Sequence, residues 1–240
     1  MAVQNGKDYL YLIWKSENTR RQYIVGQLTK NSQYEFQYSE EVQAAIEDGF
    51  RPLLCFQNLD EVYKNDKLFP VFKSRLPDRR RKDIKAILDK YGLEEYDDYL
   101  LLKRSGTRLP IDRLEFIDPI LNSNENVTRI FCMAGVRHYL KCEGKDCSQA
   151  ILVTRGDELF LRKEPDNGYD QNAVQLLDIS GNVLGYIPRY YSKGVTELLE
   201  LEKKIECHVY SVDRKGNCNE CIQVIMRVAN SCRNERLKNS

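Results

Sequence analysis

The sequence predicts an α+β protein of two domains, and three observations lead to this fold class. Segments in which apolar and polar residues alternate occur in both halves of the chain, and such alternation is typical of half-buried β-strands. Segments with apolar residues at helical spacing are few and short. A polar stretch at 122–126 interrupts the apolar pattern, so we expect domains at 1–120 and 128–232, followed by a polar tail at 233–240.

The first domain is predicted to begin with a β-sheet. Residues 9–14 and 21–27 are rich in β-forming side chains, and 15–19 suit the turn between them. Residues 34–38 then alternate aromatic and polar side chains, as expected of a strand with one buried face. Farther on, apolar side chains within 84–91 recur at helical spacing. We therefore expect a mixed sheet with helices.

Two residues are predicted to bound that helix. Pro77 suits a first helical turn, because its missing N–H is not needed there. Gly92 suits the C-terminal end, because glycine readily adopts the left-handed conformation that ends many helices.

The second domain is predicted to be a small, SH3-like or OB-like β-barrel capped by a short helix. Alternation gives 205–209 and 222–228 one apolar face each, with a turn at 213–217 between them. Apolar residues within 192–203 recur at the spacing of an amphipathic helix.

A turn and a β-hairpin are predicted within 164–188. Asn167-Gly168 is a turn dipeptide, because both residues tolerate positive φ. A strand at 173–179 would follow, Gly181-Asn182 would turn it, and Pro188 would end the returning strand. The first turn gathers tyrosine, asparagine and aspartate side chains.

Three segments resemble the motifs of the HIRAN domain. They are AGVRHY at 134–139, NGYDQN at 167–172 and GYIP at 185–188. The HIRAN domain is a small β module of fork-remodelling DNA-dependent ATPases and of stand-alone bacterial proteins, and the resemblance spans about 131–228. Two positions depart from the pattern, because Gly168 replaces the usual proline and His138 replaces one aromatic of a pair.

The resemblance implies a DNA-binding domain, which in the best-understood members holds the 3′ end of a single strand. It carries the binding roles to seven residues of this chain: Arg137, His138, Tyr139, Asn167, Tyr169, Asp170 and Tyr186.

The chemistry of these side chains suits such a role. Aromatic rings stack on bases at about 1–3 kcal/mol each, and basic side chains hold phosphates. Nearby, Tyr190 and Tyr191 offer further rings, and Arg162, Lys163 and Arg189 offer further charge.

Asp170 would suit a terminal hydroxyl, because a carboxylate accepts a hydrogen bond from a hydroxyl but repels an internal phosphodiester. The alternative is that Asp166, Asn167 and Asp170 cap their own turn through hydrogen bonds to the backbone. Tyr169 and Tyr186 would then be core aromatics. The residue pattern leaves both interpretations open.

Short motifs within 9–114 resemble the N-terminal subdomain of HipA-type toxin kinases. They are VGQL at 25–28, YEFQY at 34–38, LFP at 68–70 and RLP at 75–77. In that family the subdomain is non-catalytic, packs on the kinase core and helps to contact the antitoxin. The sequence contains no kinase core, so the resemblance implies a protein partner for this domain.

The charge of the chain is nearly balanced, with 37 basic and 36 acidic residues and a net charge of +1. Without a global basic field, any contact with nucleic acid must be local, directed at an end, or weak. We expect a cytoplasmic protein with reduced cysteines, because no membrane span or secretory signal is visible. We expect no enzyme, because phosphate-loop, nucleophile-elbow and zinc-protease motifs are absent.

Two clusters have more than one interpretation. The run of cations within 73–82 is either a patch for phosphate or an acidic partner, or a solvated helix face. We expect no cofactor, with a structural zinc as the alternative, because Cys218 and Cys221 have zinc-ligand spacing and Cys142 and Cys147 offer a second pair.

We therefore expect a non-catalytic protein of bacterial or phage origin whose HIRAN-like barrel binds the end of single-stranded DNA. One alternative is a protein-interaction adaptor that docks on a separate HipA-type kinase or antitoxin. Another is a zinc-binding accessory protein.

Overall fold

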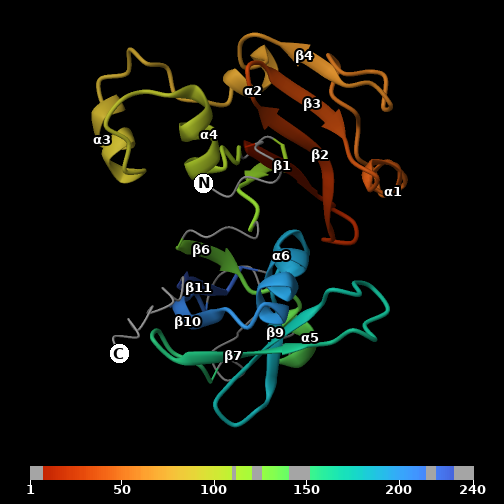
Figure 1. The fold of residues 1–240 in the computed structure, drawn as a ribbon, viewed down its shortest axis with the longest axis vertical. Helices are drawn as coiled ribbons and strands as arrows, with labels where there is room; N and C mark the ends of the chain where they lie inside the picture. The colour runs from red at the N-terminus through yellow and green to blue at the C-terminus, as the bar shows by residue number, and fades with distance from the viewer. Residues whose placement is uncertain (1–7, 110–111, 121–125, 141–151, 215–219, 230–240) are drawn as a thin grey trace, which may run out of the picture. The chain divides into compact units, whose positions relative to one another are not determined.

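The computed structural model describes residues 8–109, 112–120, 126–140, 152–214 and 220–229 (Figure 1). The chain divides into two compact units, the first ending at Pro119 and the second beginning at Ile120. Each unit has its own β-sheet and short helices, so the predicted α+β class is confirmed. Within the described ranges, no helix has the length and apolar character needed to cross a membrane.

The N-terminal unit is built on a five-stranded antiparallel sheet with the strand order β4-β3-β2-β1-β5. Phe36 and Tyr38 are buried while Gln37 between them is exposed, as the alternating pattern predicted. The strands are β1 (Asp8–Lys15), β2 (Gln22–Lys30), β3 (Tyr34–Tyr38), β4 (Tyr63–Asn65) and β5 (Leu114–Ile117).

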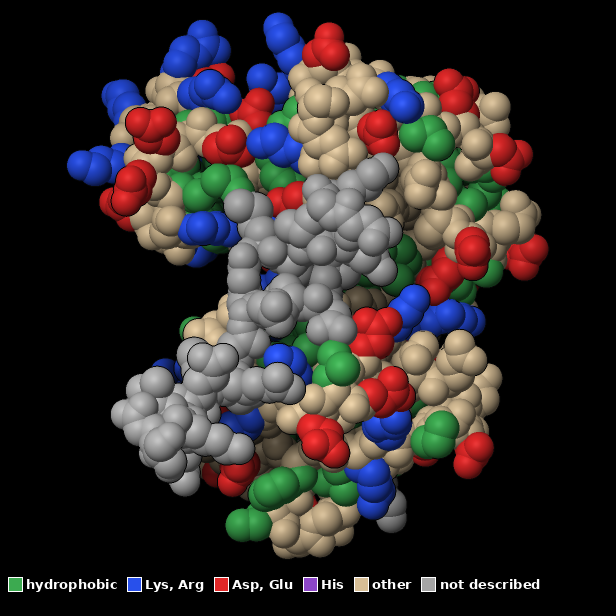
Figure 2. All heavy atoms as spheres, in the orientation of Figure 1, with side chains coloured by type: hydrophobic (Ala, Val, Ile, Leu, Met, Phe, Trp, Pro, Cys, Tyr) green, Lys and Arg blue, Asp and Glu red, His purple; other side chains and the backbone are tan. Residues whose placement is uncertain are grey.

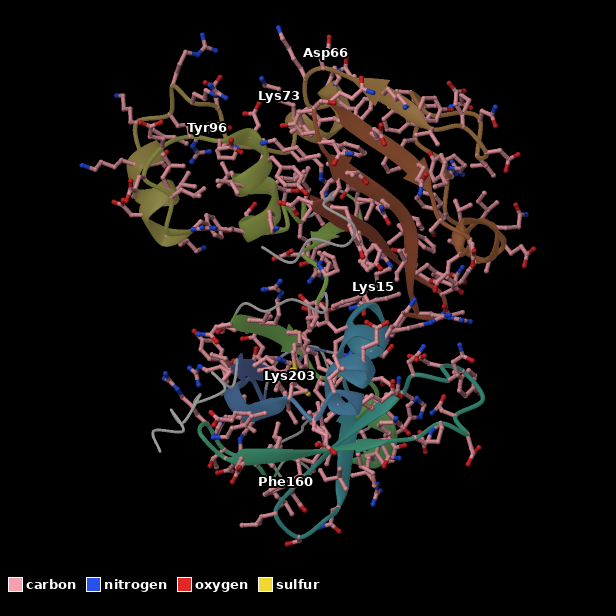
Figure 3. The ribbon with its side chains drawn as sticks, in the orientation of Figure 1. Lys15, Asp66, Lys73, Tyr96, Phe160 and Lys203 are labelled. Carbon is pink, nitrogen blue, oxygen red and sulfur yellow. The ribbon has the colours of Figure 1, made fainter. Side chains whose placement is uncertain are left out.

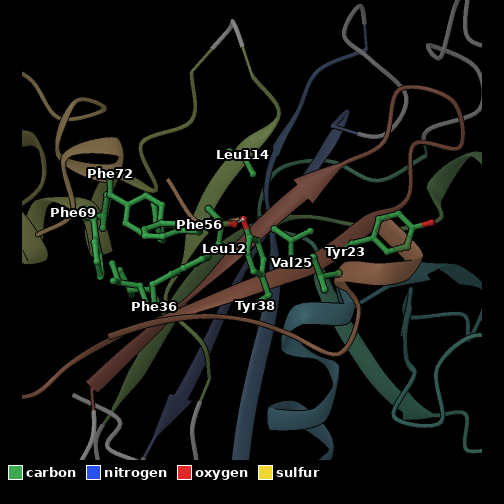
Figure 4. Close-up of a cluster of buried hydrophobic side chains, with 14 of the residues drawn as sticks. Leu12, Tyr23, Val25, Phe36, Tyr38, Phe56, Phe69, Phe72 and Leu114 are labelled. Atoms are coloured by element: carbon green, nitrogen blue, oxygen red, sulfur yellow. Dashed lines mark hydrogen bonds between the residues drawn. The ribbon is translucent and has the colours of Figure 1, made fainter. Parts of the chain in front are cut away.

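An aromatic core joins this sheet to the helices of the unit (Figure 4). The ring of Phe36 stacks on that of Phe56 at 4.5 Å and meets that of Phe72 edge-on at 5.2 Å. The hydroxyl of Tyr38 donates a hydrogen bond to the carbonyl oxygen of Phe56 at 3.0 Å, which satisfies the buried polar end of the ring. The helices are α1 (Val42–Glu47), α2 (Pro70–Lys73), α3 (Ile84–Lys90) and α4 (Asp98–Ser105).

A buried cation ties the start of β5 to the rest of the N-terminal unit. The side chain of Arg75 is 6% exposed and forms an ion pair with Asp112. Its Nη2 also donates to the carbonyl oxygens of Thr107 at 2.9 Å and Leu114 at 2.7 Å. Loss of this guanidinium would leave a carboxylate and two carbonyls without their shared donor.

The C-terminal unit contains a six-stranded antiparallel sheet with the order β6-β11-β10-β7-β8-β9. Residues 222–228 alternate between buried apolar side chains and more exposed ones, so the predicted one-sided burial is confirmed. The strands are β6 (Val127–Cys132), β7 (Glu158–Lys163), β8 (Val174–Leu177), β9 (Val183–Tyr186), β10 (Lys204–Val212) and β11 (Ile222–Ala229).

The two outer strands of this sheet are joined by one backbone pair. Ala134, which follows β6, and Tyr186, the last residue of β9, exchange N–H···O hydrogen bonds of 2.9 and 2.8 Å. The curled sheet thereby closes on itself, as a small barrel requires. Gly185 makes the close approach possible, because a Cβ there would lie 2.4 Å from the carbonyl oxygen of Ala134.

One helix, α6 (Arg189–Glu200), packs along the barrel. It begins at Arg189 rather than at the predicted residue 192, because Pro188 supplies an extended N-terminal boundary with φ −56° and ψ 143°. A Cβ at Gly194 would lie 2.0 Å from the carbonyl oxygen of Ile120, so the missing side chain lets the helix sit against that backbone.

One smaller sequence prediction is wrong, because Pro77 does not start a helix and α3 begins at Ile84. The predicted turn at Asn167-Gly168 forms, but without positive φ, and the Asn167 side chain holds it.

We expect Gly185→Ala to destabilise the C-terminal unit by about 1–3 kcal/mol, the usual effect of overpacking a filled site. The added methyl group would meet the backbone of Ala134 and the side chain of Met133. Chemical denaturation followed by backbone NMR of this unit measures the change. Gly168→Ala is the matched control, since a Cβ there meets nothing within 4 Å. Equal stability of the two variants would contradict the role given to Gly185.

We expect Arg75→Met to destabilise the N-terminal unit by about 3 kcal/mol, the lower end for breaking a buried ion pair, because Asp112 stays partly exposed. Urea unfolding measures the loss. Arg80→Met removes an equal charge from a side chain that is 90% exposed and paired with Asp78, so it should leave stability nearly unchanged. A similar loss in both variants would mean that charge, rather than the buried contacts, is responsible.

Candidate nucleic-acid interface

Three segments of the barrel bring most of the predicted site residues together. The segment after β6 turns at Gly135, whose φ is +71°, into the short helix α5 (Val136–Tyr139). Because Ala134 pairs with Tyr186, this helix lies beside the end of β9. The third segment is the turn between β7 and β8, which holds Asn167 and its neighbours.

Tyr139 and Tyr186 form an aromatic pair at this junction. Their ring centroids are 5.6 Å apart at 61°, and their hydroxyl oxygens are 2.5 Å apart. The Tyr186 hydroxyl also donates to Oε2 of Glu164 at 2.9 Å. Burial, with help from the hydrogen bonds to Tyr139 and Glu164, raises the pKa of Tyr186, so its phenol stays protonated and keeps its proton for the hydrogen bond to Glu164.

Glu164 lies at the centre of the site, although the sequence pattern did not identify it as a site residue. Its carboxylate accepts hydrogen bonds from Nδ2 of Asn167 at 2.6 Å, Nε2 of Gln175 at 2.9 Å and the hydroxyl of Tyr186. The hydrogen bond from Asn167 contributes most to lowering the pKa of Glu164, and those from Tyr186 and Gln175 add to it. The carboxylate therefore stays ionised and links β8, β9 and the turn.

The turn itself is organised by Asn167. Its Oδ1 accepts hydrogen bonds from the backbone N–H groups of Tyr169 at 2.9 Å and Asp170 at 3.1 Å. Oδ1 of Asp170 accepts from the N–H of Asn172 at 2.9 Å. The Tyr169 ring is 86% exposed, so the alternative that Tyr169 is a core aromatic is wrong. The turn holds an aromatic ring in solvent on a well-bonded backbone.

Other predicted residues lie on α5 and α6. Arg137 and His138 are exposed beside Tyr139, and among the described residues their side chains form no ion pair or hydrogen bond with the rest of the site. Tyr191 cannot offer a stacking face, because it is buried against Phe131 with ring centroids 5.7 Å apart.

The cysteine prediction falls mostly outside the described residues. Cys142, Cys147 and Cys218 lie there, and Cys221 is buried next to β11. In the part of the chain that the structure describes, no cluster of three or more histidine, cysteine, aspartate or glutamate side chains could hold a metal ion.

Most cations of the basic run near α2 and α3 are paired with carboxylates. Lys73 and Arg79 both pair with Asp98, at 3.2 and 3.0 Å. The guanidinium of Arg79 also lies 4.5 Å from the ring centroid of Tyr96, which is labelled in Figure 3 together with Lys73. Each of three further arginines has its own aspartate: Arg75 with Asp112, Arg80 with Asp78 and Arg81 with Asp83.

Fold and site together define a small β-barrel module with a surface cluster of aromatic and amide side chains. Residues 130–229 match the family model of the HIRAN domain, and residues 20–110 match that of the HipA N-terminal domain. The C-terminal part of the chain is thus a HIRAN domain, and both resemblances are confirmed.

Similar proteins include the Fanconi-associated nuclease 1 homolog of Arabidopsis thaliana, 28% identical over 83 residues. That match covers 34% of this chain and 9% of the relative, so the chain spans less than a tenth of its length. Among solved structures, the HIRAN domain of human HLTF is 18% identical over 44% of this chain and 75% of that one, with a TM-score of 0.32. A protein from Lactobacillus plantarum is also 18% identical, over 43% of this chain and 97% of that one, with a TM-score of 0.32. The HLTF domain has also been solved in its DNA-bound conformation, with 18% identity over 43% of this chain and 72% of that one and a TM-score of 0.29.

We expect the stability contributed by Glu164 to depend on pH. Its pKa is lowered by folding, so the contribution is complete above the unfolded value of about 4.3 and is lost as the pH falls through the lowered folded value. Denaturant unfolding should therefore show Glu164→Gln less stable than the parent at neutral pH, with a smaller difference in acid. Glu197→Gln, on α6 outside this network, serves as the control. A difference that persists unchanged in acid would contradict the hydrogen-bond network.

Proposed function

We propose that the chain is a non-catalytic nucleic-acid-binding protein whose HIRAN domain binds the end of single-stranded DNA. The observation that carries the proposal is the exposed Tyr169 ring on a turn that Asn167 and Glu164 connect to Tyr186. Family membership supports it, because a HIRAN domain of another protein, human HLTF, adopts a DNA-bound conformation.

Each part of the site has a chemical role in this proposal. Tyr169 stacks on a base, since aromatic faces bind bases of any sequence. The exposed guanidinium of Arg137 holds a phosphate beside the pair formed by Tyr139 and Tyr186. Amide and hydroxyl groups around Glu164 keep these side chains in place, so little conformational entropy is lost on binding.

Asp170 gives the site its preference for an end. One of its oxygens accepts the N–H of Asn172, and a carboxylate has further lone pairs for a terminal 3′-hydroxyl. A phosphate at the same place would be repelled. His138, which lies on α5, is next to the bound DNA strand in this proposal. Metals and cofactors have no part in this proposal, and the nuclease activity named for the Arabidopsis relative is not carried over.

A protein partner is a second candidate, favoured by the family match of residues 20–110 to the HipA N-terminal domain. In this alternative the N-terminal unit docks on a separately encoded kinase or antitoxin and the barrel assists. The two roles are compatible, because they use different units of the chain.

We expect the full chain to bind a labelled single strand with a free 3′-hydroxyl more tightly than the same strand with a 3′-phosphate. Tyr169→Ala should weaken binding by about 5- to 150-fold, which corresponds to the loss of one stacking contact of about 1–3 kcal/mol, while Tyr169→Phe keeps the ring and the affinity. Fluorescence anisotropy at low and moderate salt measures both effects.

Asp170→Asn is the second variant. It keeps an oxygen for the N–H of Asn172 but loses the charge, so it should reduce the discrimination against the 3′-phosphate. If neither strand binds to the parent, the nucleic-acid role is wrong and the docking alternative is favoured. If both strands bind equally, the site recognises single strands without reading their ends.

A further inference from the structure

A second surface lies on the outer face of the barrel, where β6, β11, β10 and β7 are neighbours. His208 pairs with Ile225 on one side and Glu158 on the other, while the adjacent Cys207 and Val209 point into the core. A groove on this face is lined by Arg155, Gly156, His208, Tyr210, Ile225 and Arg227.

A β-bulge presents an aromatic ring in this groove. The register between β10 and β11 shifts between Val209 and Ser211, so Tyr210 is the extra residue of the bulge. Bulges turn a side chain out of the regular alternation and occur often beside functional sites. The Tyr210 ring is 39% exposed, and the guanidinium of Arg155 lies over it at 6.0 Å from the ring centroid.

The turn that carries Arg155 is held against the same bulge. The N–H of Gly156, whose φ is +96°, donates to the carbonyl oxygen of Val209 at 2.8 Å. The N–H of Val209 donates in return to the carbonyl oxygen of Asp157 at 2.9 Å. The Asp157 carboxylate closes the turn by accepting the N–H of Thr154 at 2.8 Å. The backbone segments that carry Arg155 and Tyr210 are therefore fixed relative to each other.

Strand β7 connects this groove to the site around Glu164. Alternate residues of a strand share a face, so Glu158, Phe160 and Arg162 point outward with Glu164, which extends the ladder by donating its N–H to Ala173 at 2.8 Å. Arg162 and Glu164 both contact the side chain of Gln175, at 2.8 and 2.9 Å, which places them on one face. The path from Glu158 to Glu164 is about 20 Å long at the usual rise of a strand.

The side chains along this path combine exposed aromatic rings with cations. Phe160, labelled in Figure 3, is 44% exposed, and Arg162 next to it is exposed as well. Arg155 and Arg227 line the groove, and Glu206, which precedes its lining residues on β10, is paired with Lys204 at 2.6 Å. Along β7, Figure 2 shows hydrophobic and charged side chains next to one another rather than a continuous apolar patch. Rings alternating with guanidinium groups suit a single-stranded nucleic acid, whose bases stack and whose phosphates need cations.

We propose that the outer face of β7 and the groove at Tyr210 form a track for the strand that leaves the end-binding site. Phe160 and Tyr210 are its stacking positions, and Arg155, Arg162 and Arg227 hold the phosphates. This track rests on the proposed function, and it extends the site from one end of a strand to several consecutive nucleotides.

The test compares short and long single strands, both with a free 3′-hydroxyl, binding to the full chain. Oligothymidylates of about 3 and about 12 nucleotides bracket the lower part of the range of about 4–16 nucleotides seen for small barrels. The parent should bind the longer strand more tightly. Tyr210→Ala and Phe160→Ala should each weaken binding of the longer strand by about 5- to 150-fold and leave the short strand unaffected.

Two controls separate the track from general effects. Tyr210→Phe keeps the ring in the bulge and should bind like the parent. Arg155→Gln should weaken binding of the longer strand more than Lys85→Gln does. The Lys85 variant removes an equal charge from an exposed position on α3. Circular dichroism and thermal unfolding identify any variant that fails to fold.

Short-strand binding without any gain for the longer strand would overturn the track and leave the proposed function intact. Failure of both strands to bind would overturn both. If a partner protein is captured, its binding survives nuclease treatment and the Tyr210→Ala variant no longer captures it, this face belongs to a protein partner. That result would overturn the nucleic-acid track.

Discussion

The reciprocal backbone hydrogen bonds between Ala134 and Tyr186 are the contact on which the C-terminal unit depends. They join the segment after β6 to the end of β9, the two outer strands of the sheet, and so hold the sheet in its curled form. The same pair brings Tyr186 beside α5. At Gly135 the chain turns with positive φ, and a Cβ there would lie 3.3 Å from the Tyr186 ring. The backbone pair that closes the barrel therefore also brings the rings of Tyr139 and Tyr186 together.

Glu164 adds a second constraint, of electrostatic rather than steric origin. Its ionised carboxylate accepts from an amide on the turn, an amide on β8 and a phenol on β9. Because these donors have fixed directions, the rings and the turn that carry them are fixed as well. A negative charge at the centre of a surface meant for nucleic acid is unfavourable for internal phosphates. It is better tolerated beside a terminal hydroxyl, which supports placing the end of a strand, rather than an internal phosphate, next to Glu164.

The sequence predicted those features that depend on near neighbours. The alternation at 34–38 and 222–228 identified strands with one buried face, since side chains alternate on any strand. Glu164 was missed because its partners Gln175 and Tyr186 come from separate strands, and their convergence depends on the register of the barrel. The helix start predicted at Pro77 was wrong for a related reason. Its carbonyl accepts the hydroxyl of Tyr96, far along the chain, and such a contact cannot be read from the local pattern.

The distribution of charge explains why the barrel, rather than the basic run of the N-terminal unit, is the better candidate for binding nucleic acid. Cations attract phosphate most when no carboxylate neutralises them, and the arginines of that run lie beside aspartates. The guanidinium of Arg80, for example, holds the pKa of Asp78 down to about 2, so the pair is neutral at any ordinary pH. On the barrel, Arg155 lies over an aromatic ring, where its charge remains available to a ligand. In a chain of net charge +1, the placement of a few such cations beside rings matters more than their number.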